Sequence, residues 1–167
     1  MLITRPNHDL TTNYLYYWSG KIIEQANKNK EKVIDLKGKR ANKKEFTDII
    51  QKTKPFLIVL NGHGDESSVT GYNNEVLVRV GENENIFNDA VIYARSCSCA
   101  KKLGPASVRK GAKAFIGYTD DFVFLIDENF VTQPLNDKTA TLFLEASNYV
   151  AISLLKRHSP PEANIRS

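Results

Sequence analysis

Apolar residues recur at two different spacings along the 167-residue chain, and the alternation of these spacings predicts an α/β protein. Short runs that are apolar at nearly every position predict strands buried on both faces, at residues 2–5, 32–36, 56–60, 90–94 and 113–118. Apolar residues at helical spacing predict helices over residues 10–27, from residue 43 onward, over residues 100–111 and over residues 137–155.

Local signals refine these helices. Residues 10–27 carry an apolar face at i, i+4 spacing, made by Leu10, Tyr14, Trp18, Ile22 and Ala26. Asn42 followed by Glu45 resembles a capping box. The helix over residues 100–111 is expected to break or restart at Gly104-Pro105.

Strands and helices in alternation favour a parallel sheet with helices on both faces. We therefore predict a three-layer αβα sandwich with a mostly parallel central sheet of about five strands. The stretch SSVTGYNNEVLVRVG predicts an additional β-hairpin around residues 68–80. Residues 1–157 are expected to form a single domain, and residues 158–167 a tail or the start of a linker.

Composition narrows the function classes. The net charge of +4 comes mainly from lysines in residues 28–44, which lack the interleaved aromatic residues of a nucleic-acid surface. A solvated basic face, with an acidic partner at most, is the simpler interpretation. We predict neither a membrane span nor a signal peptide, so we expect a cytoplasmic protein. Two cysteines do not make a disulfide framework.

The candidate chemistry lies where predicted strands end. The strand over residues 56–60 runs into Asn61-Gly62-His63-Gly64, and the strand over residues 90–94 runs into Arg95-Ser96-Cys97-Ser98-Cys99. In a parallel sheet, functional groups collect at the carboxyl ends of the strands. If these two strands are neighbours, His63 and Cys97 leave the same sheet edge about 5 Å apart.

A cysteine and a histidine at that separation suit nucleophilic catalysis, with the thiolate as nucleophile and the imidazole as its proton partner. Gly62 and Gly64 would let a substrate backbone approach, and the amides of Gly64 and Cys97 could bind an oxyanion. The plainer interpretation makes His63 a turn residue and the cysteines silent core residues. The joint placement at one edge favours catalysis.

Other chemistries fit less well. Cys97, Cys99 and His63 offer three metal ligands, whereas structural zinc takes four, so we expect no metal and no cofactor. Ser96 lacks the G-x-S-x-G surroundings of a serine nucleophile. A nucleotide-binding domain would need a glycine-rich loop that this sequence lacks.

The segments FLIVLNGHG and AVIYARSC resemble the signature of the caspase-like cysteine peptidases of clan CD, and SCSCAKKLGPASVRKGAKAFIGY is similar to the bacterial CHAT pattern. The resemblance extends from Leu2 to about Tyr118. Within the group, the chain also resembles gingipain-like and metacaspase-like proteins. It implies a cysteine endopeptidase, a thiol protease with a peptide or protein substrate and a regulatory or sensor partner domain.

Residue by residue, the resemblance implies His63 as general base and Cys97 as nucleophile, with Cys99 as the alternative nucleophile. Family members that cleave after Arg or Lys place an acid in the first specificity pocket. Here Asp9 is the first candidate for that acid and Asp120 or Asp121 the next, whereas Asp137 looks like a helix start. The alternative is a catalytically silent binding or scaffold module with the same doubly wound fold.

Overall fold

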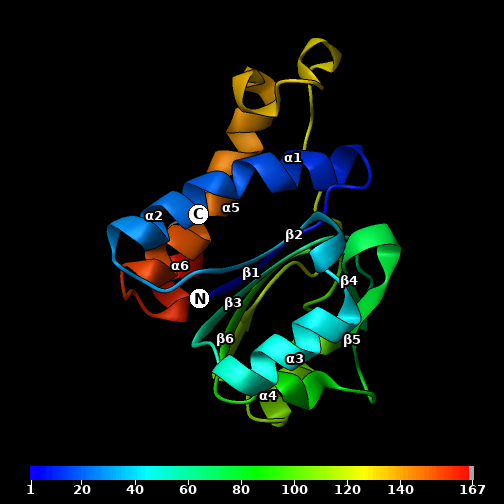
Figure 1. Ribbon diagram of the computed structural model, residues 1–167, viewed down its shortest axis with the longest axis vertical. Coiled ribbons are helices and arrows are strands. Elements are labelled where there is room, and N and C mark those ends of the chain that lie inside the picture. The colour runs from blue at the N-terminus through cyan, green and yellow to red at the C-terminus, as the bar shows by residue number, and fades with distance from the viewer. Residues whose placement is uncertain (166–167) are drawn as a thin grey trace.

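The computed structural model describes residues 1–165 and has the predicted three-layer αβα architecture (Figure 1). Its central sheet is parallel throughout, in the order β2-β1-β3-β6-β7. The strands of this sheet are β1 Leu2–Arg5, β2 Ile34–Lys37, β3 Leu57–Asn61, β6 Val91–Arg95 and β7 Ala114–Ile116. β3 lies at the centre and is buried along its whole length, as its uninterrupted apolar run predicts.

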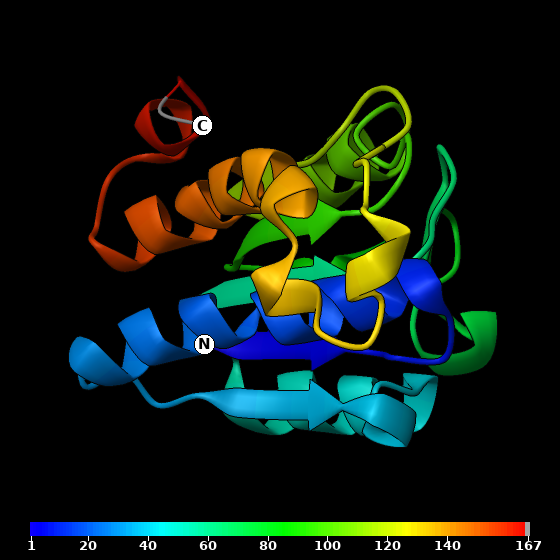
Figure 2. The same ribbon diagram turned by 90° about the horizontal axis from the view of Figure 1, so that it is seen from above.

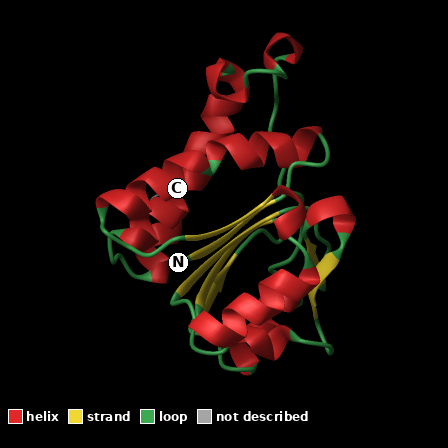
Figure 3. Ribbon diagram, viewed as in Figure 1, coloured by secondary structure: helices red, strands yellow, loops and turns green. Residues whose placement is uncertain are grey.

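Helices cover both faces of the sheet (Figures 2 and 3). They are α1 Leu10–Trp18, α2 Gly20–Lys28, α3 Lys43–Thr53, α4 Leu103–Arg109, α5 Lys138–Leu155 and α6 Pro160–Ile165. Successive strand residues face opposite layers, so Ile58 packs in the core with α3 and α4, whereas Val59 packs in the core with α2, α5 and α6. The hydrophobic effect thereby fixes which layer each helix joins.

The predicted hairpin is confirmed. β4 Ser68–Thr70 pairs antiparallel with β5 Val76–Arg79 beside the main sheet. The short 3₁₀ helix η2 Tyr72–Asn74 forms its connection, and the other 3₁₀ helices are η1 Gly38–Arg40, η3 Glu84–Phe87, η4 Glu128–Phe130 and η5 Pro134–Asn136.

The single helix predicted over residues 10–27 is wrong, because the structure divides it at Ser19 into α1 and α2. The Ser19 hydroxyl donates to the Leu15 carbonyl, and Gly20 follows directly, a combination that bends helices. The predicted apolar face continues through the break. Its first member is an exception, since Leu10 is 47% exposed.

Most other predicted boundaries agree with the structure. Asn42 caps α3 by accepting from the Glu45 amide, and Asp137 caps α5. α4 begins at Leu103, directly before Gly104-Pro105, and not at residue 100. Of the predicted tail, residues 160–165 form α6, whose Ala163 is buried in the core, and residues 166–167 lie outside the described residues.

Within residues 1–165, the helices are all too short or too polar to cross a membrane.

Arg95, the last residue of β6, is fully buried beneath the carboxyl edge of the sheet. Its Nε donates to Asn61 Oδ1 over 2.7 Å, and Nη1 donates to Asn148 Oδ1 over 2.7 Å and to Ser147 Oγ over 3.3 Å. Its Nη2 donates to Ser19 Oγ over 2.6 Å. The guanidinium therefore joins β3, α5 and the α1–α2 junction.

The partners of Arg95 are themselves bonded to the backbone around them. The Asn61 amide side chain donates to the Thr4 carbonyl of β1, and that of Asn148 donates to the Trp18 carbonyl over 2.9 Å. These partners are neutral oxygens, so the buried positive charge is stabilised by oriented dipoles. Removing one member leaves the others unsatisfied inside the protein, which is costly.

Replacing Arg95 by Ala is expected to lower the free energy of unfolding by roughly 3 kcal/mol or more, because several charge-assisted hydrogen bonds disappear and buried amide oxygens lose their donor. Urea titration followed by circular dichroism measures this loss. Arg109→Ala, on the exposed end of α4, is the matched control and should cost under about 1 kcal/mol. Equal losses in the two variants would contradict the central role of Arg95.

Candidate active site

His63 and Cys97 follow neighbouring strands at matching positions. β3 and β6 are directly hydrogen-bonded, with Asn61 opposite Arg95 in the parallel register. His63 lies two residues after Asn61, and Cys97 lies two residues after Arg95. The condition set from sequence, that the two strands be neighbours, is confirmed, and both residues leave the same sheet edge.

Backbone packing brings the two segments together beyond the ends of their strands. A Cβ atom added at Gly64 would lie 2.8 Å from the Ser68 carbonyl oxygen, 3.0 Å from the Ser96 Cβ and 3.4 Å from the Cys97 carbonyl oxygen. A side chain at position 64 would therefore push the histidine segment away from both the hairpin and the cysteine segment. Glycine at this position permits their close approach.

Gly62 has a different use from the one the sequence suggested. A Cβ atom there would lie 2.1 Å from the carbonyl oxygen of Thr70 in β4. The Thr70 amide donates to the His63 carbonyl over 2.8 Å, and its hydroxyl donates to the same oxygen over 3.1 Å. Because Gly62 has no side chain, β4 of the hairpin can pack directly against it. The hydrogen bonds from Thr70 then hold the His63 backbone in place.

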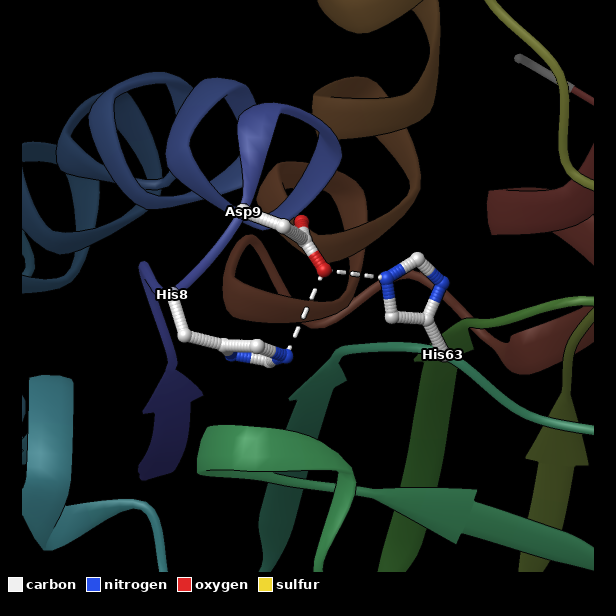
Figure 4. Close-up of side chains that lie close together, drawn as sticks. All are labelled: His8, Asp9 and His63. Atoms are coloured by element: carbon white, nitrogen blue, oxygen red, sulfur yellow. Dashed lines mark hydrogen bonds and ion pairs between the residues drawn. The ribbon is translucent and has the colours of Figure 1, made fainter.

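The imidazole of His63 meets the carboxylate of Asp9, which lies between β1 and α1 (Figure 4). The distance from His63 Nε2 to Asp9 Oδ2 is 2.7 Å. Since a carboxylate only accepts, Nε2 carries the proton and donates it, which leaves Nδ1 of a neutral ring as the acceptor. Asp9 therefore selects one tautomer of His63.

Asp9 is itself fixed as the N-cap of α1. Its Oδ1 accepts from the Thr12 amide over 2.8 Å, and the Thr12 hydroxyl accepts from the Asp9 amide, which completes a capping box. Partial burial tends to raise the pKa of Asp9, but the hydrogen bonds from Thr12 and His63 outweigh it, so the pKa lies below its ordinary value. The carboxylate is held ionised beside His63.

His8 reaches the same carboxylate from the other side. Its Nε2 lies 3.3 Å from Asp9 Oδ2 and 3.3 Å from Asn74 Oδ1. The His8 ring packs edge-on against Tyr72 at 5.4 Å between centroids and against His63 at 6.2 Å. The sequence analysis missed His8, although it directly precedes Asp9, because the sequence does not show that its ring packs on Tyr72 and Asn74 of the hairpin connection.

The two cysteines differ in environment. Cys97 is partly exposed, whereas Cys99 is fully buried, with its sulfur 3.4 Å from the Ser96 carbonyl. Burial raises the pKa of Cys99 to about 11, so its thiol stays protonated at neutral pH. Between them, Ser98 has a left-handed backbone (φ 54°). These environments favour Cys97 as the reactive thiol.

Two amides are available beside Cys97. Gly64 forms an isolated antiparallel bridge with Val69, but the hydrogen bonds of this short ladder run from Thr70 to His63 and from Asp65 to Ser68. The Gly64 N–H therefore points away from the hairpin. Within residues 1–165, neither this amide nor that of Cys97 donates to another protein group.

Of the remaining candidate acids, Asp120 and Asp121 lie together and Asp137 lies apart from them. The Asp120 carbonyl accepts from the Ser98 amide over 2.9 Å, and its carboxylate is 92% exposed, 3.9 Å from Lys101. Asp121 Oδ1 lies 3.5 Å from the Ser98 hydroxyl. Both acids therefore flank the cysteine turn. Asp137 is buried away from this edge, where it caps α5 and accepts from the Tyr14 hydroxyl over 2.8 Å.

No protein-family model, no curated protein and no solved structure matches the chain.

Alkylation with iodoacetamide at neutral pH is expected to modify Cys97 in the native protein and to spare Cys99, whose thiolate is disfavoured by burial. Intact mass spectrometry should give one adduct in the native wild type and two after denaturation. Cys97→Ala should give none in the native state. Rapid native modification of Cys99 would contradict this arrangement.

Proposed function

We propose that the protein is a cysteine endopeptidase in which His63 and Cys97 form the catalytic dyad. The observation that carries this proposal is the register of β3 and β6, which delivers both residues to one edge at matching positions. The caspase-like resemblance of FLIVLNGHG and AVIYARSC assigns the same two roles. The two cysteines are free thiols, as is usual for proteins of a reducing compartment, and we propose a cytoplasmic location.

In the proposed mechanism, His63 Nδ1 takes the proton of the Cys97 thiol, since Nε2 is already bonded to Asp9. The thiolate attacks the peptide carbonyl carbon, and the resulting oxyanion is bound by the amides of Gly64 and Cys97. Collapse breaks the C–N bond, and His63 returns the proton to the departing amine. Water, deprotonated by the same nitrogen, then hydrolyses the thioester and releases the acid product and the thiol.

Asp9 acts as a positioning residue in this scheme. Its contact with Nε2 holds the tautomer in which Nδ1 is unprotonated, and it stabilises the imidazolium that forms after proton transfer. The His63 and Thr12 contacts leave this carboxylate poorly placed for a substrate side chain.

A basic P1 residue would instead meet Asp120 and Asp121, the acids beside the cysteine turn. An arginine or lysine side chain bound there would lie beside Ser98, the residue that follows Cys97 in the chain. Pairing with a carboxylate gives a directional contact. We therefore propose cleavage after Arg or Lys, with Asp120 and Asp121 as the selecting residues.

Fluorogenic peptides with Arg, Lys, Asp, Leu or Ala at P1 test the activity. Wild type is expected to cleave the Arg and Lys peptides, Cys97→Ala to be inactive, and Cys99→Ala to retain cleavage. Asp120→Asn with Asp121→Asn should raise KM for the basic peptides. Cleavage that depends on Cys99 would move the nucleophile, and no cleavage together with two unreactive native thiols would indicate the silent binding module.

Asp9→Asn is expected to lower kcat on the order of 100-fold for every cleaved peptide, with little change in KM, because His63 loses the group that sets its tautomer. Asparagine is as good an N-cap as aspartate, so α1 should remain intact by circular dichroism. A change confined to KM or to P1 preference would instead place Asp9 in the substrate pocket, as the sequence analysis expected.

A further inference from the structure

His8, Asp9 and His63 form a cluster of metal-binding side chains at the edge of the proposed dyad (Figure 4). One ligand atom from each residue lies within 4.8 Å of the other two. The close-up shows both imidazoles directed at the same carboxylate oxygen, each from its own direction. Two imidazole nitrogens and a carboxylate oxygen are a donor set that Zn²⁺ takes at sites with three protein ligands.

The spacing of these atoms suits a tetrahedral ion. Ligand atoms about 2.05 Å from zinc and at tetrahedral angles lie about 3.3 Å apart. His8 Nε2 and Asp9 Oδ2 are 3.3 Å apart, and His63 Nε2 is 2.7 Å from the same oxygen. The three ligand atoms lie within 4.8 Å of one another, so the site forms when His63, whose side chain is 41% exposed, moves away from Asp9 Oδ2 and the two Nε2 atoms turn toward one centre.

His8 is already held for this role. Its side chain is only 8% exposed, packed against Tyr72, with Nε2 beside Asn74 Oδ1. The buried Nδ1 has no hydrogen-bond partner within residues 1–165, so no contact there locks the tautomer. Zinc binding moves the ring proton to Nδ1, where it breaks no hydrogen bond, and the bond from Nε2 to the ion replaces the contacts of Nε2 with Asn74 Oδ1 and Asp9 Oδ2.

We infer that His8, Asp9 and His63 bind a zinc ion, with a position left open for water, and that the bound ion switches off the dyad. Zinc on Nε2 of His63 replaces the proton there, and in the neutral ring the proton then sits on Nδ1. This nitrogen can no longer accept the Cys97 proton. The inhibitory part of the inference rests on the proposed function; the binding part does not.

Isothermal titration with zinc chloride tests the binding. Wild type is expected to bind one Zn²⁺, and His8→Gln, which keeps an amide beside Asp9, should bind on the order of tenfold more weakly or worse. His158→Gln, at the only histidine outside the cluster, is the matched control and should bind as wild type does. Thermal melts without zinc verify that each variant is folded.

Two results would overturn the site. His8→Gln binding zinc as tightly as wild type would remove His8 from the ligand set. Loss of binding in Cys97→Ser would assign the ion to the cysteine in place of Asp9 and His8.

The rate of Cys97 alkylation, measured with and without zinc, tests the inhibition without requiring turnover. Zinc should lower the alkylation rate at least tenfold in wild type and in His158→Gln. At the same zinc concentration it should leave the rate of His8→Gln nearly unchanged, so that the ratio of the two rates stays near one. If one Zn²⁺ binds and the rate of Cys97 alkylation does not change, the inhibitory role of zinc is overturned. Failure of every peptide to be cleaved would contradict the proposed function alone, since calorimetry detects zinc in an inactive protein.

Discussion

The buried guanidinium of Arg95 is the interaction on which the sheet edge depends. Asn61 and Arg95 are the last residues of neighbouring strands, and they are bonded to each other directly beneath the turns that carry His63 and Cys97. The same guanidinium reaches the α1–α2 junction at Ser19 and α5 at Asn148. A charge with neutral partners tolerates little displacement, because each lost contact leaves a polar group unpaired away from water. The turns that carry His63 and Cys97 are therefore supported from below by a layer of buried hydrogen bonds.

A second constraint acts from the side, through the hairpin of β4 and β5. Thr70 holds the His63 carbonyl, and the connection at Tyr72 and Asn74 packs on His8. The N-cap of α1 brings Asp9 between the two histidines. Helix capping and imidazole orientation thus use one carboxylate, so the local stability of α1 and the chemistry of His63 are coupled through the same side chain.

Much of this arrangement could be predicted from sequence because apolar runs reveal buried parallel strands, and parallel strands send their ends to one edge. That reasoning gave the sandwich, the hairpin and the placement of His63 and Cys97. It failed at Ser19, where a hydroxyl interrupts a continuous apolar face, and it missed His8 and Arg95. Arg95 bonds to Asn61, 34 residues before it, and His8 contacts Asn74, 66 residues after it, and no local pattern reports such contacts. The acids were ambiguous for the same reason: Asp9 and Asp137 both cap helices, yet only Asp9 faces His63.

The register of Asn61 against Arg95 also bears on which changes of chain length the protein can accept. Inserting or deleting one residue within β3 or β6 would shift His63 or Cys97 along the edge by one position and reverse the faces of that strand's side chains. The apolar residues of two core layers would then exchange places, so such a change would damage folding and the site together. A change of length in a connection does not reverse the faces of the strand side chains. Length variation should accordingly accumulate in the connections, while the strand lengths and the two-residue spacing after each strand stay constant.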